Sequence, residues 1–168
     1  GWPPVAAAGA VVSVARGPHH VPDIAPLDPR LGRLAPGGRV FDAGCGAGVP
    51  IAQRVGRSHR VVGVDFSERQ LALAAQHVPA IEPVCQDLTR LGLAPCVFDA
   101  IVSYYAIIHI PRVAHAGILA DFYRLLRPGG LAFLCLGALD LDDDFDDDYY
   151  GLRRGGDPHT RPTKPDPC

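Results

Sequence analysis

The stretch at positions 39–48 of this 168-residue chain limits the possible fold more than any other, and it reads R-V-F-D-A-G-C-G-A-G. A short apolar run meets an acid, Asp42, and glycines follow at alternate positions. A strand, a glycine turn and a helix in this order present backbone N–H groups to a ligand in α/β proteins. The glycines allow a tight turn and a close approach of a ligand to bare backbone. The stretch therefore predicts a ligand site beside the first strand of an α/β sheet.

Further apolar runs follow this turn and alternate with helical patterns. Strands are expected at 40–43, 60–65, 81–85, 98–103 and 131–136, and helices at 49–55, 67–78 and 112–126, the last ended by Arg127-Pro-Gly-Gly130. Ser67 is the expected N-cap of the second helix. Strands that are apolar on both faces and separated by helices indicate a parallel sheet covered on two sides. The fold class predicted is α/β, a doubly wound Rossmann-like sheet.

The ends of the chain lack this alternation. Residues 1–35 are rich in proline and are expected to be irregular, 36–139 to form the binding domain, and 140–168 to be an acidic loop and a disordered tail. Seven of the nine residues at 140–148 are Asp, which favours a solvated loop over a metal site. Because the sequence contains no methionine, we interpret it as a fragment or a processed form.

Composition excludes several classes of partner. A net charge of -2 gives no electrostatic case for binding nucleic acid or an acidic membrane surface, and no apolar run reaches the length of a membrane span. The five cysteines are odd in number and none has C-x-x-C spacing, so we expect free thiols in a reducing, cytoplasmic compartment and no metal site. The oligomeric state is left open.

The spacing of the glycines bears on the ligand. A dinucleotide fingerprint is G-x-G-x-x-G, whereas the third position here is Val49 and the spacing is G-x-G-x-G. The carboxylate of Asp42 would oppose a pyrophosphate. It would suit an ammonium group or a sulfonium centre, directly or through water.

Two later acids complete a possible nucleoside site. Asp65 ends the second strand, where a carboxylate can accept from both hydroxyls of a ribose, as it also does in NAD-binding proteins. Phe66 offers an apolar face next to it. Asp87, after the third strand, can accept from an adenine amino group and Leu88 can pack on the ring; alternatively, Asp87 is a loop residue or a helix cap.

Together these blocks resemble class I S-adenosylmethionine-dependent methyltransferases. The resemblance rests on D-A-G-C-G-A-G, G-V-D-F-S, Q-D-L, F-D-A-I-V-S-Y-Y-A-I-I-H-I-P and L-L-R-P-G-G-L-A-F-L, in the family's order from about 34 to 136. It implies a sheet of strand order 3-2-1-4-5 followed by a hairpin of strands 7 and 6, which is not found in 137–168. It also implies contacts to S-adenosylmethionine, with S-adenosylhomocysteine as product, at Asp42, Ala43, Gly44, Cys45, Gly46, Gly48, Asp65, Phe66, Asp87, Leu88, Ser103 and Tyr104. Truncation, or a reading-frame slip near Gly151, is our hypothesis for the missing hairpin.

The candidates for catalysis follow the fourth strand, at the edge where ligands bind. His109 is the best candidate for a base if the acceptor must lose a proton, because histidine is the side chain most often used for this role. The alternative is a structural histidine among isoleucines. Tyr105 is a second candidate for the acceptor pocket, and His115 on the following helix is expected to face solvent.

The function predicted is transfer of a methyl group to a small-molecule acceptor. Two alternatives remain: a cofactor-binding domain without turnover, which the missing hairpin favours, and an NAD-dependent oxidoreductase, against which Asp42 and Val49 argue.

Overall fold

The computed structural model describes residues 12–14 and 27–135, and they form a parallel sheet with helices on both faces. The strand order is β1-β6-β5-β2-β3-β4, and all neighbouring strands run parallel. Within it, β4-β3-β2-β5-β6 is the predicted order 3-2-1-4-5, which is thereby confirmed. The elements are β1 (Val12–Val14), α1 (Asp28–Leu31), β2 (Arg39–Ala43), α2 (Ile51–Val55), β3 (Arg60–Asp65), α3 (Glu68–His77), β4 (Glu82–Cys85), β5 (Phe98–Tyr104), the 3₁₀ turn η3 (Ile107–His109), α4 (Arg112–Leu125) and β6 (Leu126–Cys135).

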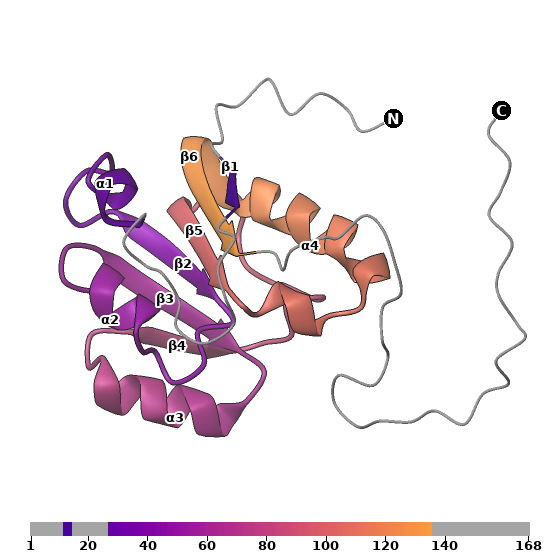
Figure 1. Cartoon of the computed structure of the whole chain (residues 1–168), viewed down its shortest axis with the longest axis horizontal. Helices are drawn as coiled ribbons and strands as arrows, with labels where there is room; N and C mark the ends of the chain where they lie inside the picture. The colour runs from indigo at the N-terminus through magenta and orange to yellow at the C-terminus, as the bar shows by residue number, and fades with distance from the viewer. Residues whose placement is uncertain (1–11, 15–26, 136–168) are drawn as a thin grey trace, which may run out of the picture. The chain divides into compact units, whose positions relative to one another are not determined.

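Successive side chains of each strand enter different layers of the core, because side chains alternate between the two faces of a sheet. Val40 packs in one apolar cluster with residues of α2 and α3, and Phe41 packs in a second cluster with Phe122 and Leu125 of α4. Figure 1 shows α2 and α3 on one side of the strands and α4 on the other. Two covered faces explain why the strands read as continuous apolar runs.

Local sequence signals set the bounds of α3. Ser67 accepts a hydrogen bond from the Gln70 N–H at 3.4 Å, so the predicted N-cap is confirmed. Glu68 lies in the first turn and His77 in the last, as the helix dipole favours. Leu71 and Ala74 are the buried residues of this helix.

The fold differs from the prediction around the last strand. We expected Arg127–Gly130 to separate α4 from a strand at 131–136, but β6 begins at Leu126, directly after the helix. Leu126 pairs with Phe98 and Leu131 with Ala100, so the four residues between them bulge out of the ladder. Gly129, at φ +78°, supplies the left-handed position of this bulge.

The segment at 1–35 also contains regular structure that we did not expect, namely β1, which pairs with β6 at the edge of the sheet, and the single turn α1. The predictions of a missing hairpin at 137–168 and of an acidic loop and tail at 140–168 concern residues outside those that the structure describes. No helix in 27–135 has both the length and the apolar character needed to cross a membrane.

Candidate functional site

The three glycines after β2 all have positive φ, and each faces a different environment. A Cβ placed on Gly44 (φ +76°) would lie 2.2 Å from the Cβ of Ala106, and one on Gly48 (φ +77°) would lie 3.3 Å from Ala74 of α3. A Cβ on Gly46 (φ +51°) would meet no atom within 4 Å. The outer two glycines therefore pack the turn against protein, and only Gly46 faces open space.

The N–H groups of this turn are already used within the protein. Gly44 and Cys45 donate to the Val64 carbonyl at 2.8 and 3.0 Å, and Gly48 donates to the Cys45 carbonyl at 2.9 Å. Gly46 donates to Asp65 Oδ2 at 3.0 Å. The expectation that the turn presents its N–H groups to a ligand is thus wrong for these four, which are not placed to cradle a pyrophosphate in the way of a dinucleotide turn.

Asp65 joins the glycine turn to the start of α3. Its Oδ2 accepts from Gly46 and its Oδ1 accepts from the Ser67 N–H at 2.9 Å. Each carboxylate oxygen has a second lone pair, so the group can still accept from a ligand. Phe66 follows with 81% of its surface exposed, which is unusual for a phenylalanine beside a buried strand.

Asp42 lies one residue before the end of β2 and is almost completely buried. Its Oδ2 has no hydrogen-bond partner among the described residues. Burial, and secondarily the nearby charge of Asp65, raises the pKa of Asp42 from 3.8 to about 7. This end of the sheet therefore holds two neighbouring carboxyl groups, of which Asp42 is buried with one oxygen that lacks a partner among the described residues.

The residues beside Asp42 are buried as well. Ala43 is fully buried. Burial first, then Asp42 and Asp65, raises the pKa of the Cys45 thiol to about 12, so this thiol stays protonated at neutral pH. No group of three or more His, Cys, Asp or Glu in the described part of the chain could hold a metal ion.

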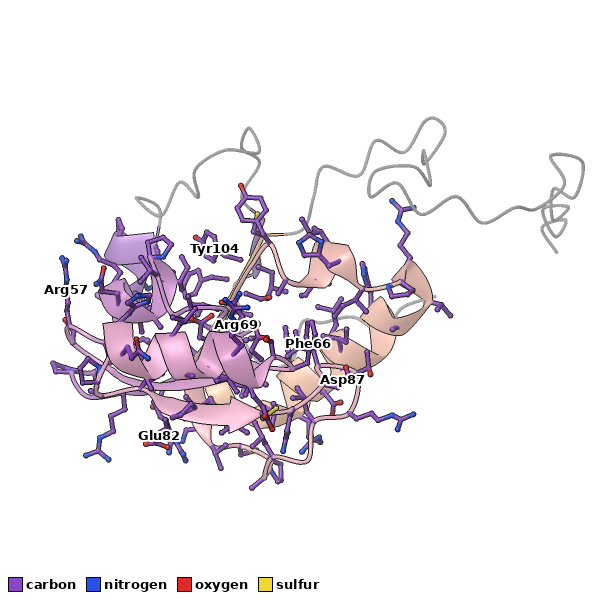
Figure 2. All side chains as sticks on the ribbon, turned by 90° about the horizontal axis from the view of Figure 1, so that it is seen from below. Arg57, Phe66, Arg69, Glu82, Asp87 and Tyr104 are labelled. Atoms are coloured by element: carbon purple, nitrogen blue, oxygen red, sulfur yellow. The ribbon has the colours of Figure 1, made fainter. Side chains whose placement is uncertain are left out.

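Asp87 follows β4, the strand that pairs with β3. Its Oδ1 accepts from both the N–H and the hydroxyl of Thr89 at 2.8 Å, and the Arg90 N–H donates to its carbonyl at 2.9 Å. Asp87 is therefore a turn residue, which was one of the two roles expected for it. The bonds from Thr89, first of all the one from its N–H, lower the pKa of Asp87 and keep the carboxylate ionised. Figure 2 shows its exposed side chain in the same region as Phe66. Leu88 is buried below the glycine turn, 3.8 Å from the Cβ position of Gly44.

The end of β5 forms another wall. Ser103 is fully buried and donates to the Ala43 carbonyl at 3.0 Å, so it holds β5 to the end of β2 rather than offering its hydroxyl to solvent. Tyr104 is half-buried against the core. Tyr105 has a φ of +56°, uncommon for a non-glycine residue, and its pKa is raised by burial and then by Cys135 at the end of β6.

The two histidines beyond β5 differ from one another. His109 is exposed at the end of η3, as expected for a group that could meet a substrate. His115 was expected to face solvent, but it is half-buried and its Nε2 lies 2.7 Å from the Ile110 carbonyl. Because a carbonyl can only accept, His115 donates from Nε2 and ties the loop after η3 to α4.

Two residues that support the turn were missed by sequence reasoning. Ala106 fills the space above Gly44, and His77 Nδ1 lies 2.9 Å from the Ala47 carbonyl. The only local signal was the position of His77, one turn after Ala74 on the helix face that meets Gly48.

Comparison with known proteins shows which proteins this chain resembles. The family described as a methyltransferase domain matches residues 40–130. A 2-phytyl-1,4-naphtoquinone methyltransferase from Thermosynechococcus vestitus is 38% identical over 105 residues, 59% of this chain and 46% of that protein. A ubiquinone biosynthesis O-methyltransferase from Rhizobium johnstonii is 34% identical over 64% of this chain and 44% of its own. The chain thus spans about half the length of these curated relatives.

A solved structure agrees with these matches. The TehB-like SAM-dependent methyltransferase from Corynebacterium glutamicum superimposes with a TM-score of 0.60 at 27% identity, covering 69% of this chain and 68% of that one.

Proposed function

This chain belongs to the methyltransferase domain family, a family of S-adenosylmethionine-dependent enzymes, and we propose that it transfers a methyl group from S-adenosylmethionine to a small-molecule acceptor. One observation carries the proposal. The N–H groups of the glycine turn are committed within the protein, while Asp65, the exposed Phe66 and the open face of Gly46 stand together at the end of β3. This arrangement favours a nucleoside with a cationic tail over a pyrophosphate.

The residues present fit such a cofactor. The remaining lone pairs of Asp65 would accept from the ribose hydroxyls, and the Asp87 carboxylate, whose two bonds from Thr89 both fall on Oδ1, would accept from the adenine amino group. Phe66 would contact the adenine ring, and the buried Leu88 would support the site from the core. The positively charged ammonium and sulfonium groups of the cofactor would interact favourably with the carboxyl groups of Asp42 and Asp65.

The remaining contact residues would act by shaping this site. Gly44 and Gly48 set the course of the turn against Ala106 and α3, and Ala43 and Cys45 flank it as buried residues. Ser103 would act indirectly, through its bond to the Ala43 carbonyl, and Tyr104 would line the cofactor's amino-acid tail.

When bound, S-adenosylmethionine would supply an electrophilic methyl group for a lone pair of the acceptor, with S-adenosylhomocysteine as the product. The protein must align the two and exclude water, and proximity supplies about 7–11 kcal/mol of the barrier reduction. We assign to His109 the removal of the acceptor's proton, since its side chain is exposed beside the site. The hydroxyl of Tyr105 would donate a hydrogen bond that orients the acceptor.

An acceptor with an apolar body suits the surface beside His109. Val113, at the start of α4, has 91% of its surface exposed, and Ile108 and Ile110 are half-exposed nearby in sequence. The naphthoquinone methyltransferase named above acts, by its name, on such a molecule. A cytoplasmic location is supported by the unbridged thiols of the four described cysteines.

The test has two stages. Calorimetry with S-adenosylhomocysteine should show micromolar-range binding, and a labelled-methyl assay against a panel of apolar phenols and quinols should show turnover. His109→Gln should lower kcat by about 10²–10⁴-fold, with unchanged binding of S-adenosylhomocysteine. Absence of binding by folded protein would overturn the proposal, and binding without turnover on any acceptor would favour a non-catalytic cofactor-binding domain.

A further inference from the structure

A second candidate site lies at the opposite end of the sheet from the glycine turn. A cavity of about 510 Å³ is bounded by α1 and the loop after it, and by the end of α2 and the loop that leads into β3. Arg57 marks this position in Figure 2, far across the view from Phe66 and Asp87. The helix α2 separates the two places, since it begins just after the glycine turn and ends at this cavity.

The lining of the cavity has two parts of different character. Leu31, Leu34, Pro36 and Val55 provide an apolar part. Arg54, Arg57 and His59 provide the polar part together with Ser58, and no Asp or Glu is among the described lining residues. We call the polar part, formed by Arg54, Arg57, Ser58 and His59, the rim of the cavity. An apolar lining beside a rim of positive or neutral polar groups suits a molecule that is apolar at one end and anionic at the other.

The histidine of this rim sits between the cavity and a carboxylate. His59 Nδ1 is buried without a hydrogen-bond partner among the described residues, and it lies 3.6 Å from the Cβ position of Gly38. Asp99 Oδ2 lies 3.5 Å from that same position. His59 is half-buried and lines the cavity, so its imidazole can be reached by a ligand bound there.

The charge of Asp99 interacts with His59 of this rim, which contributes to the lowered pKa of Asp99. Asp99 already accepts from the Arg39 N–H at 2.7 Å and from the Arg127 guanidinium at 2.6 Å. Arg57 is exposed at the mouth of the cavity, where a planar guanidinium can bind a carboxylate or phosphate through two parallel bonds.

We propose that this cavity binds a small amphipathic organic anion, with its apolar body against Leu34 and Val55 and its carboxylate or phosphate held by Arg57 and His59. This site is separate from the methyl-transfer site and does not depend on the proposed function. It gives the domain a second small-molecule ligand, recognised at the amino ends of β2 and β3.

The proposal can be tested on the whole chain by NMR with two probes of nearly equal shape. 1-Naphthoate carries the anion, and naphthalene-1-methanol replaces it with a neutral hydroxymethyl group. 1-Naphthoate should shift the amide signals of Gly32, Val55 and Ser58 and should bind about tenfold more tightly than the neutral probe, a preference that falls as salt is raised.

A pair of variants localises the effect. Arg57→Gln should weaken 1-naphthoate binding about fivefold or more, because a charge-assisted contact is lost. Arg60→Gln removes the same charge from an exposed residue that does not line the cavity, and it should change the affinity less than twofold. Equal binding of both probes, equal effects of both variants, shifts centred on Gly46 and Phe66, or no binding at millimolar probe would each overturn the proposal. Binding of S-adenosylhomocysteine in the same samples reports on the proposed function separately.

Discussion

The two ends of the sheet hold a carboxylate in opposite ways. At the amino end, burial alone would raise the pKa of Asp99, but bonds from the Arg39 N–H and Arg127 outweigh it and the pKa is lowered. At the carboxyl end, Asp42 has a pKa raised to about 7, because it is buried, has one oxygen without a partner and lies near Asp65. One end compensates its charge within the protein and the other does not.

This difference separates a structural use of a carboxylate from a ligand-binding use. A buried carboxyl without a partner is unfavourable in its charged form, which makes Asp42 a candidate for binding a cationic group of a ligand. The cationic groups of S-adenosylmethionine would supply the opposite charge at Asp42. At Asp99 the chain itself supplies the partners, and the cavity nearby is left with an excess of positive charge.

Removing the ionisable group of Asp42 is the strongest test of this difference between the two ends of the sheet. Between pH 4 and 7 the folded protein keeps the Asp42 proton and the unfolded chain has lost it, so stability falls as pH rises across this range. A pKa raised from 3.8 to about 7 corresponds to at most about 4 kcal/mol at pH 8. Asp42→Asn should therefore stabilise the protein by up to this amount at pH 8 and by little at pH 4, as measured by urea unfolding.

Asp99→Asn is the matched control, and its effect should have the opposite sign. The lowered pKa of Asp99 means that its contribution is present at neutral pH and is lost as pH falls through the folded-state pKa. We expect Asp99→Asn to destabilise the protein at pH 7 by about 1–3 kcal/mol. A destabilising effect of Asp42→Asn at pH 8 would show that this carboxylate has partners within the protein.

A second prediction compares two glycines with the same φ of +76° at opposite ends of the sheet. Gly37→Ala introduces a Cβ that meets nothing within 4 Å, so only the left-handed backbone is unfavourable, at about 1–2 kcal/mol. Gly44→Ala adds an overlap with Ala106 at 2.2 Å, and we expect a total loss of about 3–4 kcal/mol in the free energy of unfolding. Equal losses would mean that the loop after β5 moves away from the turn without resistance.

The sequence predicted the features that local chemistry determines. The strands and the N-cap at Ser67 follow from apolar periodicity and from residues close together in the chain, whereas the strand order came from the resemblance to the methyltransferase family. The acids at the ends of β2 and β3 were identified for the same reason. The burial of Asp42 and the hydrogen bond from Gly46 to Asp65 could not be predicted from the sequence. Both depend on how segments that are distant in the chain pack together.

Other differences have a similar origin. The bulge at Arg127–Gly130 arises because β6 must pair with β5 on both sides of four residues that read as a turn. Ser103 ends a predicted strand, and nothing local in the sequence shows that β5 lies beside β2 or that the Ser103 hydroxyl bonds to the Ala43 carbonyl. The amino-end cavity combines residues after α1 with residues after α2, and no motif links them in the sequence.

The smallest predicted effect concerns binding, and it compares a carboxylate at each end of the paired strands β3 and β4. Asp65→Ala should weaken the affinity for S-adenosylhomocysteine about 10- to 100-fold, since it removes the ribose acceptor and releases the N–H groups of Gly46 and Ser67. Isothermal calorimetry measures this loss. Glu82→Ala, at the amino end of β4, removes only an exposed ion pair with Arg39 at 2.9 Å.

Glu82→Ala should leave the affinity for S-adenosylhomocysteine unchanged and alter the free energy of unfolding by less than about 1 kcal/mol, because exposed ion pairs contribute little. An equal loss of affinity in both variants would point to a general loosening of the sheet. A loss confined to Asp65→Ala would assign the ligand to the carboxyl end of the sheet, where Asp42 has an oxygen without a partner among the described residues.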